Sequence, residues 1–176
     1  MNKLDAYNLR RAEPTAKELS KITRNPIVLV LDNILDTYNI GSMFRLADAI
    51  AAEKIYLCGN MEYPPSSRIH KAAVGTENWV PWEKTDSALE AVQKLKKEGK
   101  QIVTIEQHKS SVPLKNFKPH FPVALVAGHE SQGVSREVVE NSDTVVELPM
   151  YGINKSFNVW GATAVVAYKI LENYSP

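Results

Sequence analysis

The most constraining feature of the sequence is an unbroken apolar run, Ile27-Val28-Leu29-Val30-Leu31. A strand with one face in water alternates apolar and polar residues, so an unbroken run is typical of a strand buried on both faces. Similar short runs predict further strands at 54–58, 101–105, 123–127 and 144–148. Strands buried on both faces occur mainly in parallel sheets, whose crossover connections are usually helices.

The segments between these strands carry the start and stop signals of helices. One helix has its candidate N-caps within residues 36–39 and is predicted to extend to about residue 52. A capping box of Ser87 and Glu90 opens another helix, which we expect Gly99 to end. Shorter helices are predicted at 67–73 and 135–141. The predicted fold class is α/β, with a mostly parallel sheet flanked by helices.

The last predicted helix, at about 157–172, is apolar on almost every side. Its apolar residues are Phe157, Val159, Trp160, Ala164, Val165, Val166, Tyr168, Ile170 and Leu171. Ser156 is its predicted N-cap. Such a helix must be covered on most sides, either by the core of its own domain or by a partner subunit.

The 176 residues are predicted to form one domain that follows a short basic arm. The arm comprises residues 1–25, and its first 24 residues carry six basic and three acidic side chains. Residues 26–176 are predicted to form the domain. The whole chain is 44% hydrophobic and 23% charged, which is ordinary for a globular protein. No apolar run approaches the roughly 20 residues of a membrane span. The single cysteine, Cys58, favours a reducing compartment, so we expect a cytoplasmic protein.

Several common kinds of chemistry have no signature in the chain. Neither the glycine-rich dinucleotide fingerprint nor a phosphate-binding P-loop follows the first predicted strand. The four histidines are scattered and show no metal-ligand spacing, so we expect no metal site. The net charge of +1 permits an RNA partner without indicating one.

Three segments carry the functional signal, and the first is Asn39-Ile40-Gly41-Ser42-Met43-Phe44-Arg45. Its simplest interpretation is a helix start, with Asn39 as a cap and Gly41 allowing a close approach of a neighbouring element. The functional interpretation places Arg45 at the entry turns of this helix. From there its planar guanidinium would grip a phosphate.

The second segment joins a buried strand to Gly128-His129-Glu130-Ser131-Gln132-Gly133. A plain turn is one interpretation. The alternative is a ligand site, because open α/β sheets bind ligands beyond the carboxyl ends of their strands. Gly128 and Gly133 would then let a ligand approach the backbone.

The third segment is Leu148-Pro149-Met150-Tyr151-Gly152, followed by Asn154-Lys155-Ser156-Phe157-Asn158. A strand end and a helix cap explain it structurally. Ser156 and Asn158 also place a hydroxyl and an amide at the mouth of a buried helix, where the packing beneath them can hold them rigidly.

Taken in order, the three segments resemble the SpoU (TrmH-like) family of RNA 2′-O-methyltransferases, within the SPOUT superfamily. The family pattern reads N-x-G-x-x-x-R, then G-N-E-x-x-G, then I-P-M followed by S-L-N-V. The resemblance spans about residues 27–172. The chain departs from the pattern at His129, Phe157, Trp160 and Gly161, which puts the cofactor and dimer contacts near them in doubt.

The resemblance implies a domain whose C-terminal part forms a deep trefoil knot, an arrangement that general topology rules would not propose. It implies a homodimer and S-adenosylmethionine as the cofactor. By position, the residues that would line the cofactor pocket are Ile105, Glu106, Gly128, Leu148, Met150 and Ser156.

The resemblance also assigns the catalytic set, which is Arg45, Asn39, Glu130, Ser156 and Asn158. Arg45 would act on the ribose 2′-hydroxyl, and we favour a role in which it holds the adjacent phosphate and the 2′-oxygen, because arginine keeps its proton. Asn39 and Glu130 would fix Arg45 and the ribose, while Ser156 and Asn158 would shape the two substrate pockets.

The implied RNA partner is a compact feature such as a tRNA loop, favoured over ribosomal RNA because the basic arm is short. The same reaction on rRNA is the closest alternative. A catalytically silent RNA-binding or assembly factor is a second alternative, which the intact catalytic set disfavours. Base methylation is a third, and the Asn39–Arg45 segment favours ribose instead. The sequence leaves the RNA and the modified nucleotide open.

Overall fold

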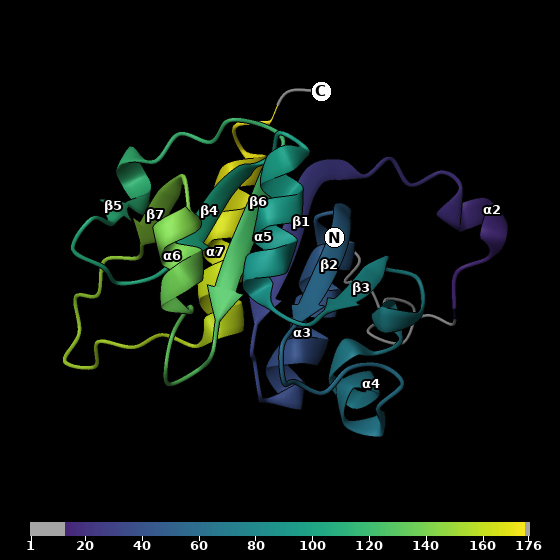
Figure 1. Cartoon of the computed structure of the whole chain (residues 1–176). Coiled ribbons are helices and arrows are strands. Elements are labelled where there is room, and N and C mark those ends of the chain that lie inside the picture. Colours follow the sequence, from purple (N-terminus) through teal and green to yellow (C-terminus); the bar gives the residue numbers. More distant parts are fainter. Residues whose placement is uncertain (1–12, 175–176) are drawn as a thin grey trace, which may run out of the picture.

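The computed structural model describes residues 13–174, which form one seven-stranded sheet with helices on both faces (Figure 1). Every strand pairing in the sheet is parallel, as predicted. The strand order is β3-β2-β1-β6-β4-β7-β5. The strands are β1 (Asn25–Asp32), β2 (Ala52–Cys58), β3 (Trp82–Thr85), β4 (Gln101–Ile105), β5 (Val112–Pro113), β6 (Val123–Gly128) and β7 (Thr144–Glu147).

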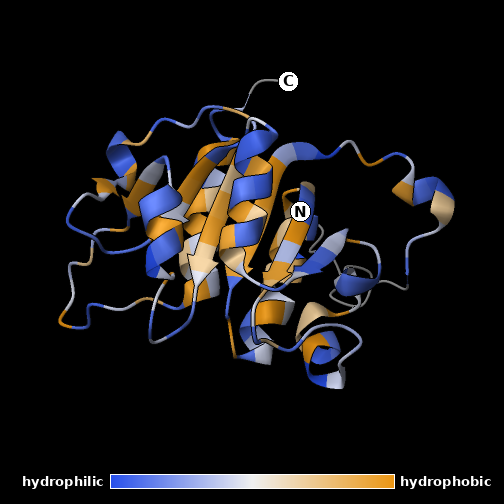
Figure 2. Ribbon diagram, in the orientation of Figure 1, coloured by the Kyte–Doolittle hydropathy of each residue, from blue (hydrophilic) through white to orange (hydrophobic). Residues whose placement is uncertain are grey.

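The central strands confirm the prediction drawn from the apolar run. β1 lies between β2 and β6, and residues 27–31 are at most 1% exposed. Its register with β6 runs from Ile27 opposite Val123 to Asp32 opposite Gly128. The carboxyl ends of β1 and β6 therefore lie side by side, and Figure 2 shows the hydrophobic residues gathered in these strands.

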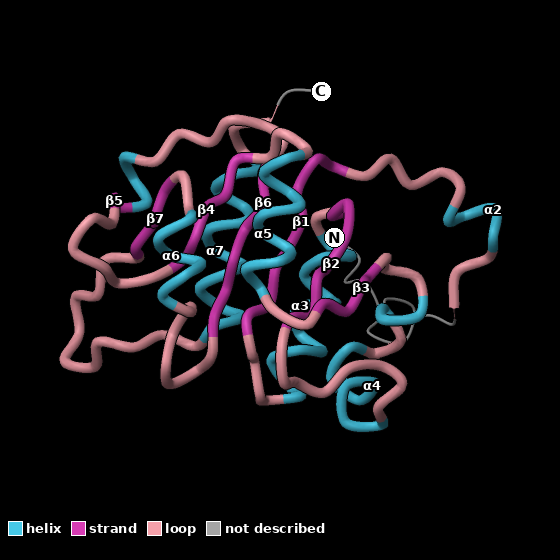
Figure 3. The backbone as a smooth tube through the Cα atoms, viewed as in Figure 1, coloured by secondary structure: helices cyan, strands magenta, loops and turns pink. Residues whose placement is uncertain are grey.

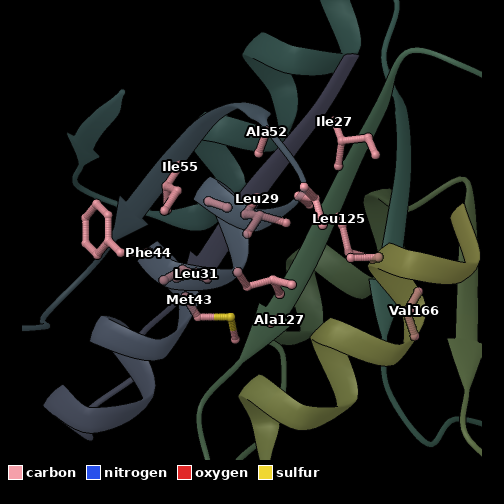
Figure 4. Packing of buried hydrophobic residues seen from close by; sticks show 14 of the residues in the cluster. Ile27, Leu29, Leu31, Met43, Phe44, Ala52, Ile55, Leu125, Ala127 and Val166 are labelled. Carbon is pink, nitrogen blue, oxygen red and sulfur yellow. The ribbon is translucent and has the colours of Figure 1, made fainter. Parts of the chain in front are cut away.

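Alternate residues of β1 pack against helices on opposite faces of the sheet. Leu29 and Leu31 belong to a cluster that includes Met43 of α3 (Thr37–Ala49) and Val166 of α7 (Val159–Leu171), as Figure 4 shows. The neighbouring β1 residues pack against α5 (Ala88–Lys97) and α6 (Arg136–Asn141) on the other face. Because successive side chains of a strand point to opposite faces, β1 contributes residues to two separate cores.

α4 (Ser67–Ala73) packs on α3 at the predicted close approach. A Cβ on Gly41 would lie 2.6 Å from the Cβ of Ala72 and 2.7 Å from the backbone oxygen of Ile69, closer than real Cβ atoms approach. A glycine is therefore required where the two helices cross. The turn η1 (Thr76–Asn78) follows α4, and a second such turn, η2 (Leu114–Asn116), follows β5 (Figure 3).

Several predicted boundaries were wrong. The helix predicted to reach residue 52 ends at Ala49, because Ala51 turns at φ 46° and Ala52 begins β2. The last helix begins at Val159, and its N-cap is Asn158 in place of Ser156. Ser87 accepts the backbone N–H of Glu90 at 3.2 Å, as a cap should. Strands β3 and β5 were not predicted at all.

The described part of the N-terminal arm contains one short helix, α2 (Ala16–Leu19), opened by a capping box of Thr15 and Glu18. Arg24 anchors the end of the arm by donating to the backbone oxygens of Ala52 (2.9 Å) and Trp79 (3.2 Å). The other predicted arm residues, 1–12, lie outside the described part of the chain. Among residues 13–174, no helix is long and apolar enough to cross a membrane.

Candidate active site

A cavity of about 210 Å³ opens where the carboxyl ends of β4, β6 and β7 meet the loop 148–158 and the start of α7. In Figure 1 this loop, drawn in yellow-green, runs below the sheet toward α7. Ligands of open α/β sheets bind at this edge. All six residues predicted to bind the cofactor line the cavity: Ile105, Glu106, Gly128, Leu148, Met150 and Ser156.

Gly128 has a local structural role that the sequence did not predict. A Cβ at this position would lie 2.3 Å from the backbone nitrogen of Val134 and 2.4 Å from the carbonyl carbon of Gly133. The close approach at Gly128 is therefore made by the protein's own backbone. His129 and Gly133 exchange backbone hydrogen bonds of 3.0 and 2.9 Å, and Gly133 turns at φ 73°. The two glycines fold the loop 128–134 back on itself at the rim of the cavity.

His129 explains how a histidine fits where the family pattern has asparagine. Its Nδ1 accepts the backbone N–H groups of Ser131 (3.0 Å) and Gln132 (3.2 Å). An asparagine side-chain oxygen makes the same local turn contact to residues two or three positions on. The departure therefore preserves a hydrogen-bond acceptor at this place in the loop.

Glu106 ties the end of β4 to this loop. Its Oε2 accepts the N–H of Val134 at 2.9 Å and its Oε1 accepts the N–H of Gln107 at 2.8 Å. The side chain of Gln107 donates to the backbone oxygen of Lys155 at 2.5 Å, and Lys155 Nζ donates to the carbonyl of Gly152 at 2.8 Å. These bonds cross-link three separate loops around the cavity. Sequence reasoning missed Gln107 and Lys155, although Lys155 lies within the third segment.

Asn39, Glu130 and Asn158 form one hydrogen-bonded chain. Asn39 Nδ2 donates to Glu130 Oε1 at 2.9 Å, and Asn39 Oδ1 accepts from Asn158 Nδ2 at 3.2 Å. The side chain of Asn39 is nearly inaccessible to solvent, at 2% exposed for the residue, so both its polar atoms are used inside the protein. Asn158 Oδ1 also accepts the N–H of Trp160 at 3.0 Å and so caps α7. The three segments predicted to act together are therefore joined directly.

Glu130 also accepts backbone N–H groups from the turn before α3, Leu35 at 3.1 Å and Asp36 at 3.0 Å. Partial burial acts to raise the pKa of Glu130, but hydrogen bonds from Asn39 and from the backbone of Glu130, Leu35 and Asp36 outweigh it. The net effect is a pKa below the ordinary value, so the carboxyl is held as an anion. The site thus keeps a fixed negative charge beside the cavity.

Arg45 does not lie at the entry turns of its helix, where the sequence placed it. α3 begins at Thr37, so Arg45 lies eight residues further along, about 12 Å down the helix axis. It is exposed, and it makes no hydrogen bond or ion pair with any residue in 13–174. Its predicted contacts with Asn39 and Glu130 are absent among these residues. Its guanidinium is free to meet a ligand from solvent.

Ser156 lines the cavity from outside α7. Its N–H and its hydroxyl both bond to Asn154 Oδ1 at 3.0 Å, and residues 151–158 are all exposed. Thr163, buried in the first turns of α7, adds a hydroxyl that donates to the Val159 carbonyl at 2.8 Å and was not predicted. Within residues 13–174, no group of three or more His, Cys, Asp or Glu side chains has the arrangement of a metal site.

Comparisons with known proteins identify the family of the chain. The family model described as the SpoU rRNA Methylase family matches residues 26–168. A tRNA (guanosine(18)-2′-O)-methyltransferase of Aquifex aeolicus is 30% identical over 154 residues, which cover 87% of this chain and 72% of the relative.

Two solved structures show the same architecture. The TrmH/SpoU tRNA modifying enzyme of A. aeolicus superposes with a TM-score of 0.79 at 29% identity, covering 89% of this chain and 82% of that one. The SpoU methyltransferase AviRb of Streptomyces viridochromogenes, in complex with the cofactor AdoMet, gives 0.76 at 23% identity, covering 91% and 66%. Because the family model covers most of the domain, the chain belongs to the SpoU rRNA Methylase family.

Proposed function

We propose that the protein transfers a methyl group from S-adenosylmethionine to a ribose 2′-hydroxyl of RNA. The observation that carries the proposal is the chain Glu130–Asn39–Asn158, which joins three segments at the rim of the cavity. Membership of the family and the 2′-O-methyltransferase name of the A. aeolicus relative support the reaction class.

The cavity fits S-adenosylmethionine by its chemistry. Leu148, Met150 and Val159 offer an apolar surface for the adenine ring, and the Ser156 hydroxyl lies on the same wall. The anionic Glu130 beside them favours a positively charged ligand. When bound, S-adenosylmethionine supplies an electrophilic methyl on a sulfonium. The AdoMet complex of the structurally similar AviRb supports this choice of donor.

Arg45 holds the acceptor nucleotide in this proposal. The planar fork of its guanidinium suits the 2′-oxygen together with the neighbouring phosphate. The proton of the 2′-hydroxyl passes to that phosphate. Asn39 and Glu130 do not touch Arg45 and act as positioning residues that fix the start of α3 against the loop 128–134. Asn158 fixes the start of α7, and Ser156 shapes the donor pocket.

Three further features of the family belong to the proposal. The C-terminal segment forms a deep trefoil knot around the cavity, a placement consistent with the cross-link between Gln107 and Lys155. The protein works as a cytoplasmic homodimer. The dimer is supported by apolar residues of α7 that are exposed in the single chain: Trp160, Val165 and Tyr168.

The favoured substrate is tRNA, with rRNA as the second candidate. The A. aeolicus relative is named for a tRNA guanosine, whereas the family description names rRNA. The decisive experiment is the transfer of labelled methyl from S-adenosylmethionine to total tRNA and, separately, to total rRNA, followed by nucleoside analysis. A 2′-O-methylated nucleoside in one pool confirms the reaction and selects the substrate. A methylated base, or no transfer by protein that binds the donor, would overturn the proposal.

A further inference from the structure

A second cavity, of about 640 Å³, lies beside α4 and η1, away from the cavity proposed for the donor. The aromatic ring of Trp82 and the turn Pro64-Pro65 form its apolar lining, while Ser67, His70 and Asn78 add polar groups. No residue lines both cavities. The second cavity is therefore a separate site with the mixed lining expected of a small-ligand pocket.

The polar centre of this cavity is the pair His70 and Glu77. His70 Nδ1 lies 2.5 Å from Glu77 Oε1. The Glu77 side chain is only 7% exposed, whereas that of His70 is 62% exposed. Glu77 is thus a buried carboxylate that holds an accessible imidazole in one orientation, with its own second oxygen left without a partner among the described residues.

An incompletely satisfied buried carboxylate is costly, and such groups call for an explanation. Here Glu77 Oε1 fixes the imidazole ring through Nδ1. The other ring nitrogen, Nε2, makes no hydrogen bond with residues 13–174. It is therefore available to form a hydrogen bond with a ligand in the cavity.

Two exposed basic side chains on α4 lie next to residues that line the cavity. Arg68 follows Ser67 and Lys71 follows His70, and neither has an ion pair with any described residue. Two nearby carboxylates are hydrogen-bonded to neutral side chains, Glu62 to Ser66 and Glu13 to Asn78 at 2.9 Å. This last bond brings the N-terminal arm to the rim of the cavity.

The cavity is also rigidly connected to the helix that carries Arg45. α4 crosses α3 at Gly41, one helical turn before Arg45, about 6 Å along the axis. Trp79, at the end of η1, donates from its indole to Asp48 of α3 at 2.6 Å. Trp82 packs edge-on against Phe44 with ring centroids 6.5 Å apart. The helix that carries Arg45 and the helix that lines the cavity are therefore packed directly together.

We propose that this cavity receives a nucleotide of the substrate RNA close to the methylated one, with its base against Trp82 and a polar atom hydrogen-bonded to His70. Aromatic side chains hold unstacked RNA bases in this way, and oriented polar groups recognise their edges. Arg68 and Lys71 contact the flanking phosphates. This inference rests on the proposed function, since it assigns the RNA strand to the same face as Arg45.

The test compares His70→Gln and Glu77→Gln with His120→Gln, an exposed histidine remote in sequence from the cavity. The measurements are the Kd for unfractionated tRNA and for rRNA, the Kd for S-adenosylmethionine, and Tm. We expect His70→Gln to weaken binding of the preferred RNA about tenfold, the size of one hydrogen bond. Glu77→Gln should weaken it without lowering Tm, because it removes an incompletely paired buried charge. Donor affinity should not change in any variant.

Unchanged RNA affinity in a folded His70→Gln protein would overturn the inference, as would an equal loss in His120→Gln. If the His70→Gln protein does not fold, the test uses a Ser67→Cys protein that carries a photo-crosslinker on the introduced thiol. Burial raises the pKa of the native Cys58 thiol to about 12, so the introduced thiol is the reactive one. RNA crosslinking above that of a matched Lys118→Cys protein supports the site, and crosslinking no higher overturns it. RNA binding that depends on His70 without methyl transfer would refute the proposed function alone.

Discussion

The side-chain amide of Asn39 donates to Glu130 at 2.9 Å, which joins the first turn of α3 to the loop after β6 across 91 positions of sequence. The same side chain accepts from Asn158, the cap of α7. One buried amide therefore sets the relative position of both helices at the rim of the donor cavity. Its geometry is a property of the fold, and its consequences for catalysis can be measured.

Asn39→Ala removes both bonds and leaves Glu130 and Asn158 each short of a partner. We expect a loss of about 1–3 kcal/mol in the free energy of unfolding, because two hydrogen bonds worth about 0.5–1.5 kcal/mol each are lost. Methyl transfer should fall further than stability explains, since α3 loses its alignment. Urea unfolding and single-turnover kinetics measure the two effects. Asn116→Ala, on an exposed turn, is the matched control; equal effects in both would contradict the assignment.

Arg45→Lys separates charge from fork geometry. Because Arg45 has no partner among the described residues, Tm should stay unchanged. Lysine keeps the charge but cannot make two parallel bonds to the ribose oxygen and phosphate. We expect the rate of methyl transfer at saturating RNA to fall about 100-fold, the typical cost of losing one preorganised donor. Substantial activity in Arg45→Lys would show that charge alone suffices.

Variants at position 129 test whether the ring nitrogen of His129 replaces the side-chain oxygen of the asparagine in the family pattern. His129→Asn retains an acceptor for the N–H groups of Ser131 and Gln132, whereas His129→Leu removes it. We expect the first variant to bind S-adenosylmethionine like the wild type. The second should bind it about fivefold to tenfold more weakly, because the loop 128–134 loses two backbone contacts. Titration calorimetry distinguishes them, and equal affinities in all three proteins would exclude this role.

The sequence correctly predicted the strands that are buried on both faces, but it did not predict the strands at the edges of the sheet. The run 27–31 lies buried at the centre of the sheet, and its unbroken pattern was sufficient to place it. β3 reads Trp-Glu-Lys-Thr at a sheet edge, and β5 has two residues, so neither carries a hydrophobic period. Their pairing comes from β2 and β7, which local patterns do not encode.

The candidate site, too, was predicted only in part. The six residues that the resemblance assigned to the cofactor all line the cavity, and Asn39, Glu130 and Asn158 are joined by hydrogen bonds. Arg45 lies farther from the helix start than predicted, because the helix begins at Thr37, at the early end of the predicted range of N-caps. The pair His70 and Glu77 was missed because only the fold brings η1 back onto α4.

The exposed apolar residues of α7 predict a dimer that depends on them. Val165 and Tyr168 are 46% and 49% exposed in the single chain. We expect Val165→Glu to give a monomer in sedimentation experiments, because the carboxylate would be desolvated at the interface. Lys118→Glu, also at an exposed position, makes a larger change of charge and should leave the mass unchanged. A wild-type monomer at micromolar concentration would refute the proposed dimer.

Glu130 makes stability depend on pH in a defined window. Its pKa lies below its ordinary value of 4.5 in the folded protein, since its hydrogen bonds outweigh the effect of burial. Folding therefore favours the anion, and this contribution is complete above pH 4.5 and is lost as the pH falls through the lower folded pKa. Glu130→Gln cannot titrate, so the Tm difference between wild type and variant should shrink as the pH falls from 6 toward 3. Asp143 also has a lowered pKa but is present in both proteins, so its effect cancels in this difference. A Tm difference that does not change with pH would show that the Glu130 carboxylate contributes nothing to the fold.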